Sequence, residues 1–197
     1  MNVTVVVPTL TGREAICKRT VAAYKDQGAE VLIVKGASSC GEGWAYGFER
    51  AKGDVILLGL DDMIPDEGTV EAGEKAAREG IYPSPRIVLK DGSLESCGTL
   101  GGGGCHLSEC PTGTLAYMSS APIATREAWE KIGPPIPIHY YVDDYLGYMA
   151  RRAGLDCQVV REYAFTHYEE EHGRARVVAR AMQDRDIFVT AISGAVQ

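Results

Sequence analysis

The sequence has no long hydrophobic run and no export signal. None of its apolar stretches approaches the roughly 18 residues that a membrane-spanning helix requires. The first apolar run, residues 3–7, has no basic residues before it and stops at Pro8, which is too early for a signal peptide. We therefore expect a cytoplasmic protein that does not insert into a membrane.

The sequence also lacks the common nucleotide and metal motifs. It contains no GxGxxG or P-loop motif, and no two of its six cysteines form a C-x2-C pair. Without an export signal, we expect the thiols to be free. One cluster has the spacing C-x7-C-H-x4-C and consists of Cys97, Cys105, His106 and Cys110. It is either a zinc site or part of a flexible, glycine-rich lid around residues 101–104 that carries incidental thiols.

Basic residues are in the minority, with 20 against 27 acidic residues, a net charge of −7 and a pI near 5.1. This balance disfavours non-specific binding to nucleic acid. The excess is local, because residues 151–197 carry seven of each sign whereas residues 59–80 carry seven acidic and two basic side chains. Such a cluster is either a solvated helix face or a cation site.

Length and composition are those of one globular domain. The 197 residues are 45% hydrophobic and 24% charged, which excludes a disordered or collagenous chain. A chain of this size buries about 70% of its unfolded surface, which is enough for a stable core without disulfides or structural metals. Trp44 and Trp129 stand among apolar neighbours and are expected in that core. No repeat or linker divides the sequence, so we expect one domain over residues 1–197.

The first half alternates strand and helix patterns, and the second half is mixed. The alternation predicts a mostly parallel sheet, hence an α/β fold. In the first half we expect strands at 3–7, 30–34 and 54–60, and helices at 12–27 (capped by Thr11), 42–51 and 65–79. In the second half we expect a hairpin of 86–90 with 93–97, strands at 115–120 and 157–160, and helices at 125–132 (capped by Thr125), 142–153 and 172–186.

Ligands of an open parallel sheet bind beyond the carboxyl ends of its strands. Those ends are here Pro8-Thr9-Leu10, Lys35-Gly36 and Asp61-Asp62. Two adjacent carboxylates after an apolar strand are costly unless they are neutralised. The simplest neutraliser is Mg²⁺ or Mn²⁺ bridging a diphosphate. The alternative is that the pair favours the positive end of the next helix.

Four segments, in the right order, resemble family 2 glycosyltransferases of the GT-A fold. They are residues 3–9 (first strand and nucleotide loop), 53–68 (strand-end acidic motif), 142–154 (acidic motif and Arg-rich helix) and 165–167 (late histidine). The resemblance spans about residues 3–175 and implies a single GT-A-like, Rossmann-like domain. The short chain looks most like compact, phage-type members, for which the location would be the host cytoplasm.

The resemblance implies metal-dependent, inverting transfer of a sugar from a nucleotide sugar, with a UDP-sugar most expected, to an acceptor hydroxyl. Residues 1–80 would form the donor half and residues 81–197 the acceptor half. Asp143 would be the general base, Asp144 would orient the acceptor, and Asp62 with His167 would hold Mn²⁺ or Mg²⁺. The donor would contact Pro8, Thr9, Leu10, Arg13, Lys35, Gly36 and Asp61.

Three positions depart from the family pattern. Lys35-Gly36 stands where the family usually has an acidic residue that holds the nucleotide base. Met63 replaces the third acid of the D-x-D motif, and Tyr145 replaces the second acid of the later motif. The departures leave the base and the sugar of the donor open.

Other functions remain open at this stage. The chain could be a non-catalytic sugar- or nucleotide-binding module, or a sugar-nucleotide nucleotidyltransferase, for which the first loop offers only Gly12 and Arg13. Asp143 could be a helix cap, and His167 could be structural. The acceptor could be a glycan, a virion protein, a lipid-linked sugar or a hydroxymethylated base of phage DNA. For DNA, six arginines would offset the acidic body, or they form a solvated helix face: Arg151, Arg152, Arg174, Arg176, Arg180 and Arg185.

Overall fold

The computed structural model describes residues 2–98, 110–116, 119–168 and 174–194, with the backbone alone over 174–179. One four-stranded sheet forms from the first half of the chain and a later edge strand. Its first three strands run parallel, and the last is antiparallel. The strand order is β2 (Glu30–Lys35), β1 (Val3–Thr9), β3 (Val55–Leu58) and β7 (Ile123–Thr125).

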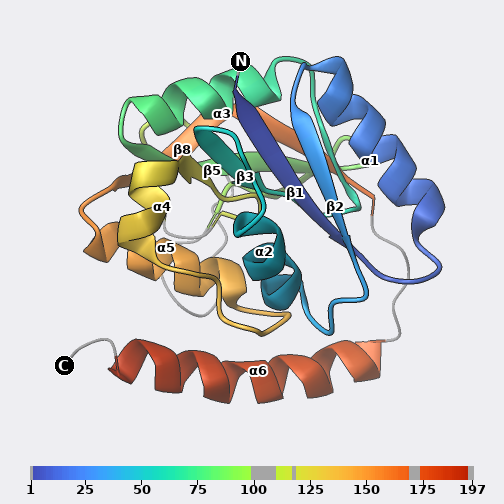
Figure 1. The fold of residues 1–197 in the computed structure, drawn as a ribbon, viewed down its shortest axis with the longest axis vertical. Helices are drawn as coiled ribbons and strands as arrows, with labels where there is room; N and C mark the ends of the chain where they lie inside the picture. The colour runs from blue at the N-terminus through green and yellow to red at the C-terminus, as the bar shows by residue number, and fades with distance from the viewer. Residues whose placement is uncertain (1, 99–109, 117–118, 169–173, 195–197) are drawn as a thin grey trace.

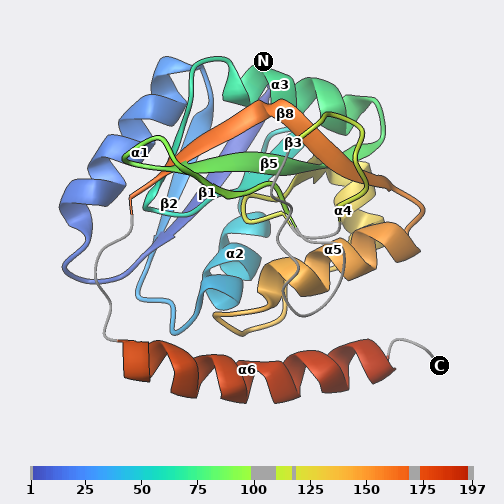
Figure 2. The same cartoon turned by 180° about the vertical axis from the view of Figure 1, so that it is seen from behind.

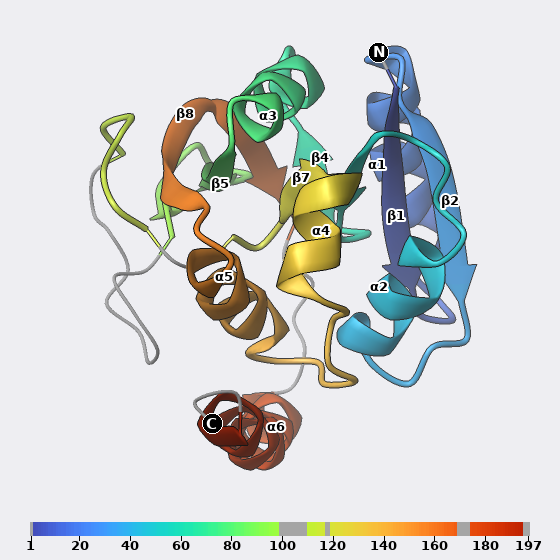
Figure 3. The same ribbon diagram turned by 60° about the vertical axis from the view of Figure 1, so that its left-hand side comes forward.

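A second four-stranded sheet forms mainly from the second half. Its central pair, β5 and β8, is parallel and its two outer pairings are antiparallel. The strand order is β4 (Met63–Pro65), β8 (Asp156–His167), β5 (Ile81–Leu89) and β6 (Leu94–Ser96). Figure 3 shows β1 and β2 on one side of the molecule and β5 and β8 on the other. The α/β class is confirmed, but the strands form two sheets instead of one central sheet.

Helices cover both sheets. They are α1 (Glu14–Asp26), α2 (Cys40–Phe48), α3 (Thr69–Arg78), α4 (Arg126–Ile132), α5 (Val142–Arg152) and α6 (Arg174–Gly194). Figures 1 and 2 both show α6 lying across one end of the molecule, beside α2 and α5. Within the described ranges, no helix combines the length and apolar character needed to cross a membrane.

The core lies on both faces of β1. Val5 and Val7 pack into one buried cluster, and Val6 packs into the other. Every residue of this strand except Pro8 is buried, which explains why its sequence is a continuous apolar run. Trp44 and Trp129 are each 1% exposed, which confirms their core position.

Several element boundaries differ from the sequence prediction. Thr11 does not cap α1, which begins at Glu14 without a side-chain cap. Residues 63–65 form β4, because this segment pairs with the end of β8, and α3 begins only at Thr69. The last strand continues to His167. Leu115 makes only an isolated bridge to Gln158, and residues 117–118 lie outside the described part of the chain.

Other boundaries are confirmed. Thr125 caps α4 by accepting a hydrogen bond from the Ala128 amide. The Asp91-Gly92 turn joins β5 to β6, and Gly92 has the positive φ of +82° that this turn requires. Helix α5 occupies the range expected for it.

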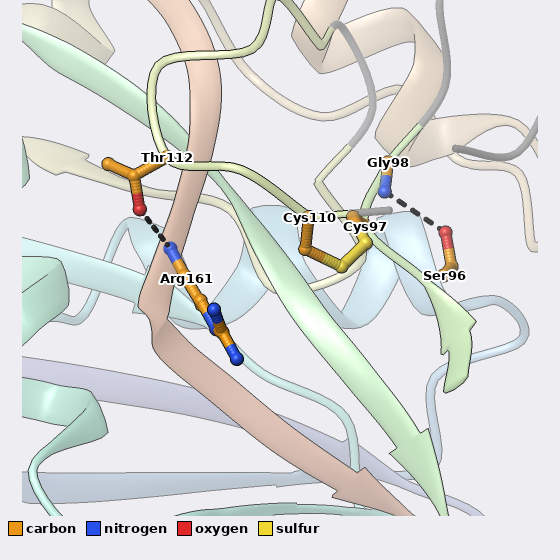
Figure 4. Close-up of a disulfide and its surroundings, with 6 residues drawn as sticks. All are labelled: Ser96, Cys97, Gly98, Cys110, Thr112 and Arg161. Atoms are coloured by element: carbon orange, nitrogen blue, oxygen red, sulfur yellow. Dashed lines mark hydrogen bonds between the residues drawn. A yellow bond between two sulfur atoms is a disulfide. The ribbon is translucent and has the colours of Figure 1, made fainter. Parts of the chain in front are cut away.

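The expectation of free thiols is wrong for one pair. Cys97 and Cys110 form a disulfide, with Cα atoms 5.5 Å apart (Figure 4). The fold brings the end of β6 beside the segment after residue 109, a proximity that cysteine spacing cannot reveal. A zinc site using both sulfurs is therefore excluded in this state. Cys105, His106 and residues 101–104 lie outside the described residues.

Candidate active site

Asp61 lies at the carboxyl end of β3 and is 7% exposed. Its Oδ2 accepts a hydrogen bond from Thr9 Oγ1 at 2.7 Å. The Arg13 guanidinium donates to both Asp61 oxygens from Nε at 3.0 Å, and to Oδ1 from Nη2 at 2.9 Å. The Asp61 carboxylate is thus held by groups from β1 and the start of α1.

Arg13 also binds the second carboxylate of the pair. Its Nη2 lies 2.6 Å from Asp62 Oδ2. Burial alone would lower the pKa of Arg13, but the bonds to Asp61 and the charges of both carboxylates raise it overall. The sequence predicts a metal ion as the neutralising cation, whereas in the structure a buried arginine contacts both carboxylates.

His167 joins the acidic pair from the second sheet. It pairs with Met63 at the end of β8, and the next amide, that of Tyr168, donates to the Asp62 carbonyl at 2.9 Å. His167 Nε2 lies 3.7 Å from Asp62 Oδ2, and Nδ1 lies 2.8 Å from Glu95 Oε2. Burial opposes a charged ring, but the two carboxylates raise the pKa of His167 to about 10.

The Asp62 carboxylate is an oxygen donor of the kind that Mn²⁺ and Mg²⁺ prefer. His167, whose pKa of about 10 keeps the ring protonated at neutral pH, becomes a nitrogen donor only when a metal displaces that proton. Glu95 on Nδ1 directs Nε2 toward Asp62, as an outer-sphere carboxylate does at many metal sites. Arg13 competes for the same Asp62 oxygen. Within the described residues, no three His, Cys, Asp or Glu side chains converge on one point. A metal here would therefore need ligands from its substrate or from water.

Asp143 and Asp144 occupy the first turn of α5. Desolvation and, secondarily, the charge of Asp144 raise the pKa of Asp143 to about 7. A carboxyl group with this pKa changes protonation near neutral pH, as a general base needs.

Cys40, at the start of α2, links the two acidic groups in space. Burial raises the pKa of its thiol first, and the charges of Asp143, Asp62 and Asp61 raise it further. The charges of Asp61, Asp62 and Asp143 therefore all act on one buried thiol, although Asp143 lies more than 80 residues from the strand-end pair in the sequence.

The other expected donor residues line the same edge of the first sheet. Thr9 of β1 pairs in parallel register with Lys35 of β2, so both strands end together. Leu10 is 51% exposed, and Lys35 is exposed. Gly36 turns the chain with a φ of +79°. Pro8 packs against Gly43 of α2.

Two residues of the site are not predicted by the sequence. Glu95 contacts His167 from β6, and Thr20 of α1 donates to the Asp61 carbonyl at 2.8 Å. Neither has a local sequence signal, because each acts through a contact across elements.

No protein-family model and no curated protein matches the chain. Solved structures do match it. A197 from STIV is 15% identical with a TM-score of 0.62, and the match covers 86% of this chain and 87% of that one. The mannosyltransferase PcManGT from Pyrobaculum calidifontis, in complex with GDP-Man and Mn²⁺, is 14% identical with a TM-score of 0.58 and covers 93% of this chain. TarS from S. aureus, in complex with UDP-GlcNAc, is 16% identical with a TM-score of 0.60 and covers 87%.

The chain has the GT-A fold. The likeness to the two transferases is one of fold, given the low identities. This GT-A chain spans 64% of PcManGT and 60% of the TarS fragment, whereas it spans most of A197. In the GT-A fold seen here, Asp62 lies between β3 and β4, and Asp143 lies in the first turn of α5.

Proposed function

We propose that the chain is a glycosyltransferase that moves a sugar from a nucleotide-sugar donor to an acceptor hydroxyl, with inversion. The observation that carries the proposal is the cluster of Asp62 with His167 and Arg13 after β3 in a GT-A fold, with the charge of Asp143 acting on the same buried Cys40 thiol as the acidic pair. Residues 1–80 supply most of the donor side and residues 81–197 supply the base. Glu95 and His167 reach back from the second half to the donor side.

Asp143 acts as the general base in this proposal. Its ionised carboxylate takes the proton of the acceptor hydroxyl as the acceptor oxygen attacks the anomeric carbon. The bond from that carbon to the phosphate oxygen breaks, and its electron pair leaves with the nucleoside diphosphate. Because one displacement occurs from the opposite face, the configuration inverts. Asp144, one residue away, orients the acceptor.

Asp62 and His167 are the side chains that would hold Mn²⁺ or Mg²⁺, and Glu95 would keep His167 Nε2 directed at the ion. When bound, such an ion stabilises negative charge on the leaving diphosphate. Arg13 and Thr9 hold Asp61 in place beside it. Support for a metal also comes from PcManGT, whose structure contains Mn²⁺.

The donor is a UDP- or GDP-linked sugar. TarS holds UDP-GlcNAc and PcManGT holds GDP-Man, so both bases occur among proteins of this fold. Lys35 and Gly36, at the end of β2, lie where the base would bind, and we retain UDP-sugars as the first candidates. Glycans, virion proteins and hydroxymethylated DNA remain the candidate acceptors.

The deciding experiment is a screen of UDP-, GDP- and dTDP-sugars for hydrolysis and transfer, with Mn²⁺ and with EDTA, using hydroxymethylated DNA as one acceptor. We expect turnover with Mn²⁺ that EDTA abolishes. Asp62→Ala should lose metal-dependent turnover, whereas Asp143→Asn should lose transfer but keep donor binding.

Activity that survives EDTA or Asp62→Ala would refute the metal role. Loss of donor binding in Asp143→Asn would count against a base. The matched control is Asp186→Asn, an exposed carboxylate of α6 remote from these side chains in sequence. If no donor is turned over and Asp62→Asn binds nucleotide sugar normally, the chain is a binding module instead.

A further inference from the structure

Asp184 of α6 is a buried carboxylate that the proposed reaction does not use. It is 1% exposed. Its Oδ2 accepts hydrogen bonds from two consecutive backbone amides, those of His139 at 2.8 Å and Tyr140 at 2.9 Å. Arg180, one turn earlier in α6, donates to Oδ1 at 3.1 Å. Helix α6 is thus hydrogen-bonded to the loop between α4 and α5.

The loop between α4 and α5 contains a residue with a strained backbone conformation. Tyr141 has φ 63° and ψ 4°, and no other non-glycine residue in the described part of the chain has a positive φ. A bulky side chain adopts this left-handed conformation only where surrounding contacts enforce it. The Tyr141 ring stacks on Phe188 of α6, with centroids 5.7 Å apart and planes 18° from parallel.

The opposite side of the loop is held by α2. The Gly41 amide donates to the Ile138 carbonyl at 2.9 Å, and a side chain at Gly41 would collide with the Ile136 carbonyl. The loop is therefore fixed between α2 and α6. Figures 1 and 2 show α6 lying across the end of the molecule, below α5.

Tyr141 is also the N-cap of α5, and Asp143 follows two residues later. The Tyr141 carbonyl accepts the first helical hydrogen bond, from Tyr145 at 2.9 Å. Because the backbone angles of Tyr141 set the direction in which the first turn leaves the loop, they also set the position of the Asp143 carboxylate. Relaxation of Tyr141 to negative φ would rotate that turn.

We infer that Asp184 and Phe188 are positioning residues: α6 holds Tyr141 in its left-handed conformation and so places Asp143 for proton transfer. This inference rests on the proposed function for its kinetic consequence. Neither residue touches the acceptor or donor in this scheme; both act through the loop of residues 139–141.

The test compares Asp184→Ala and Asp184→Asn with the control Asp186→Asn on the exposed face of α6. We expect Asp184→Ala to lower kcat by about 10- to 100-fold with donor KM changed less than about twofold, because misplacement of the base affects chemistry more than donor binding. Asp184→Asn keeps an acceptor oxygen for the amides and should recover part of kcat. Amide hydrogen exchange at His139 and Tyr140 should accelerate in Asp184→Ala and not in the control.

A separate readout follows the Asp143 carboxyl by carbon-13 NMR titration in each folded variant. We expect its midpoint to move in Asp184→Ala and stay in place in Asp186→Asn. Unchanged exchange and an unchanged titration in folded Asp184→Ala would overturn the inference, as would an equal loss of kcat in the control. If Asp184→Ala does not fold, Asp184→Asn serves for the same comparison.

The two proposals fail in distinguishable ways. If the wild-type chain turns over no donor but the exchange and titration respond to Asp184→Ala, the proposed function fails and the positioning stands. If turnover is normal in Asp184→Ala, the positioning fails and the proposed function stands.

Discussion

Arg13 is the counter-ion of the two carboxylates that follow β3. Arg13 is 8% exposed, and three of its hydrogen bonds go to Asp61. Burying such a pair is costly, but removing one partner costs more because it leaves an uncompensated charge in the interior. Asp61 therefore depends on Arg13 for its counter-charge, whereas Asp62 also has His167 at 3.7 Å.

We predict that Arg13→Ala lowers the free energy of unfolding by about 3–5 kcal/mol. Arg13→Lys should lose part of this, because an ammonium group cannot form the planar fork that spans both Asp61 oxygens. Urea denaturation gives the comparison, with the exposed Lys18→Ala as control. A loss in Arg13→Ala as small as that in the control would contradict the buried ion pair.

Asp143 should make both stability and activity depend on pH near neutrality. The folded protein keeps the Asp143 proton up to about pH 7, whereas the unfolded chain releases it near pH 4. The folded state binds more protons in this window, so its stability falls as pH rises from about 4 to about 7. Transfer should rise over the upper part of that window, because only the ionised carboxylate accepts a proton.

We predict that Asp143→Asn removes this part of the pH dependence. The drop in unfolding free energy between about pH 4 and about pH 8 should shrink by roughly 2–4 kcal/mol. Urea denaturation at several pH values, with Asp186→Asn alongside, measures it. Parallel stability profiles for Asp143→Asn and the wild type would show that the Asp143 pKa is ordinary.

At the scale of elements, α2 lies unusually close to the end of β1. A Cβ atom at Gly43 would stand 2.5 Å from Pro8 Cβ and 3.3 Å from Ala37 Cβ. The glycine lets the helix pack directly on the loop that the proposal assigns to the donor.

We predict that Gly43→Ala lowers the unfolding free energy by about 1–3 kcal/mol through overpacking. It should also raise donor KM, because Pro8 has to move. The control is Gly194→Ala at the end of α6, where a Cβ meets nothing within 4 Å. Thermal denaturation with donor titration measures both effects, and a neutral Gly43→Ala would show that α2 can shift freely.

Helix α4 agrees with its sequence prediction because its start signal is local: Thr125 accepts a hydrogen bond from the Ala128 amide, three residues away. Pro65 followed by Asp66 and Glu67 is also a local helix-start signal, but it fails. Residues 63–65 form β4 because the end of β8, about 100 residues later, pairs with them. That partner strand lies beside residues 63–65 only after the chain has folded.

At the scale of the whole molecule, one covalent bond ties the second sheet to the segment that follows it. Cys97 is fully buried after β6, and Cys110 begins the described segment before the Leu115–Gln158 bridge (Figure 4). The bond joins residues 13 apart in the sequence. Closing a loop of this size restricts the unfolded chain more than the folded one.

We predict that the double change Cys97→Ala and Cys110→Ala lowers the unfolding free energy by about 3 kcal/mol under oxidising conditions. Dithiothreitol should lower the stability of the wild type by a similar amount and leave the double variant unchanged. Guanidinium denaturation with and without the reductant measures all four cases. A wild type indifferent to dithiothreitol would mean that the bond contributes little.

The sequence by itself determined the α/β class, the buried β1 and the residues of the acidic motifs, because each depends on neighbours along the chain: apolar runs, caps, turns and short motifs. Only the tertiary structure decided four contacts: Arg13 with Asp61 and Asp62, Glu95 with His167, Cys97 with Cys110, and Asp184 with the loop before α5. Each of these contacts joins residues that are distant in the sequence or lie in separate elements. Charge, burial and bond geometry can favour such a contact only after the sheets have brought the residues together.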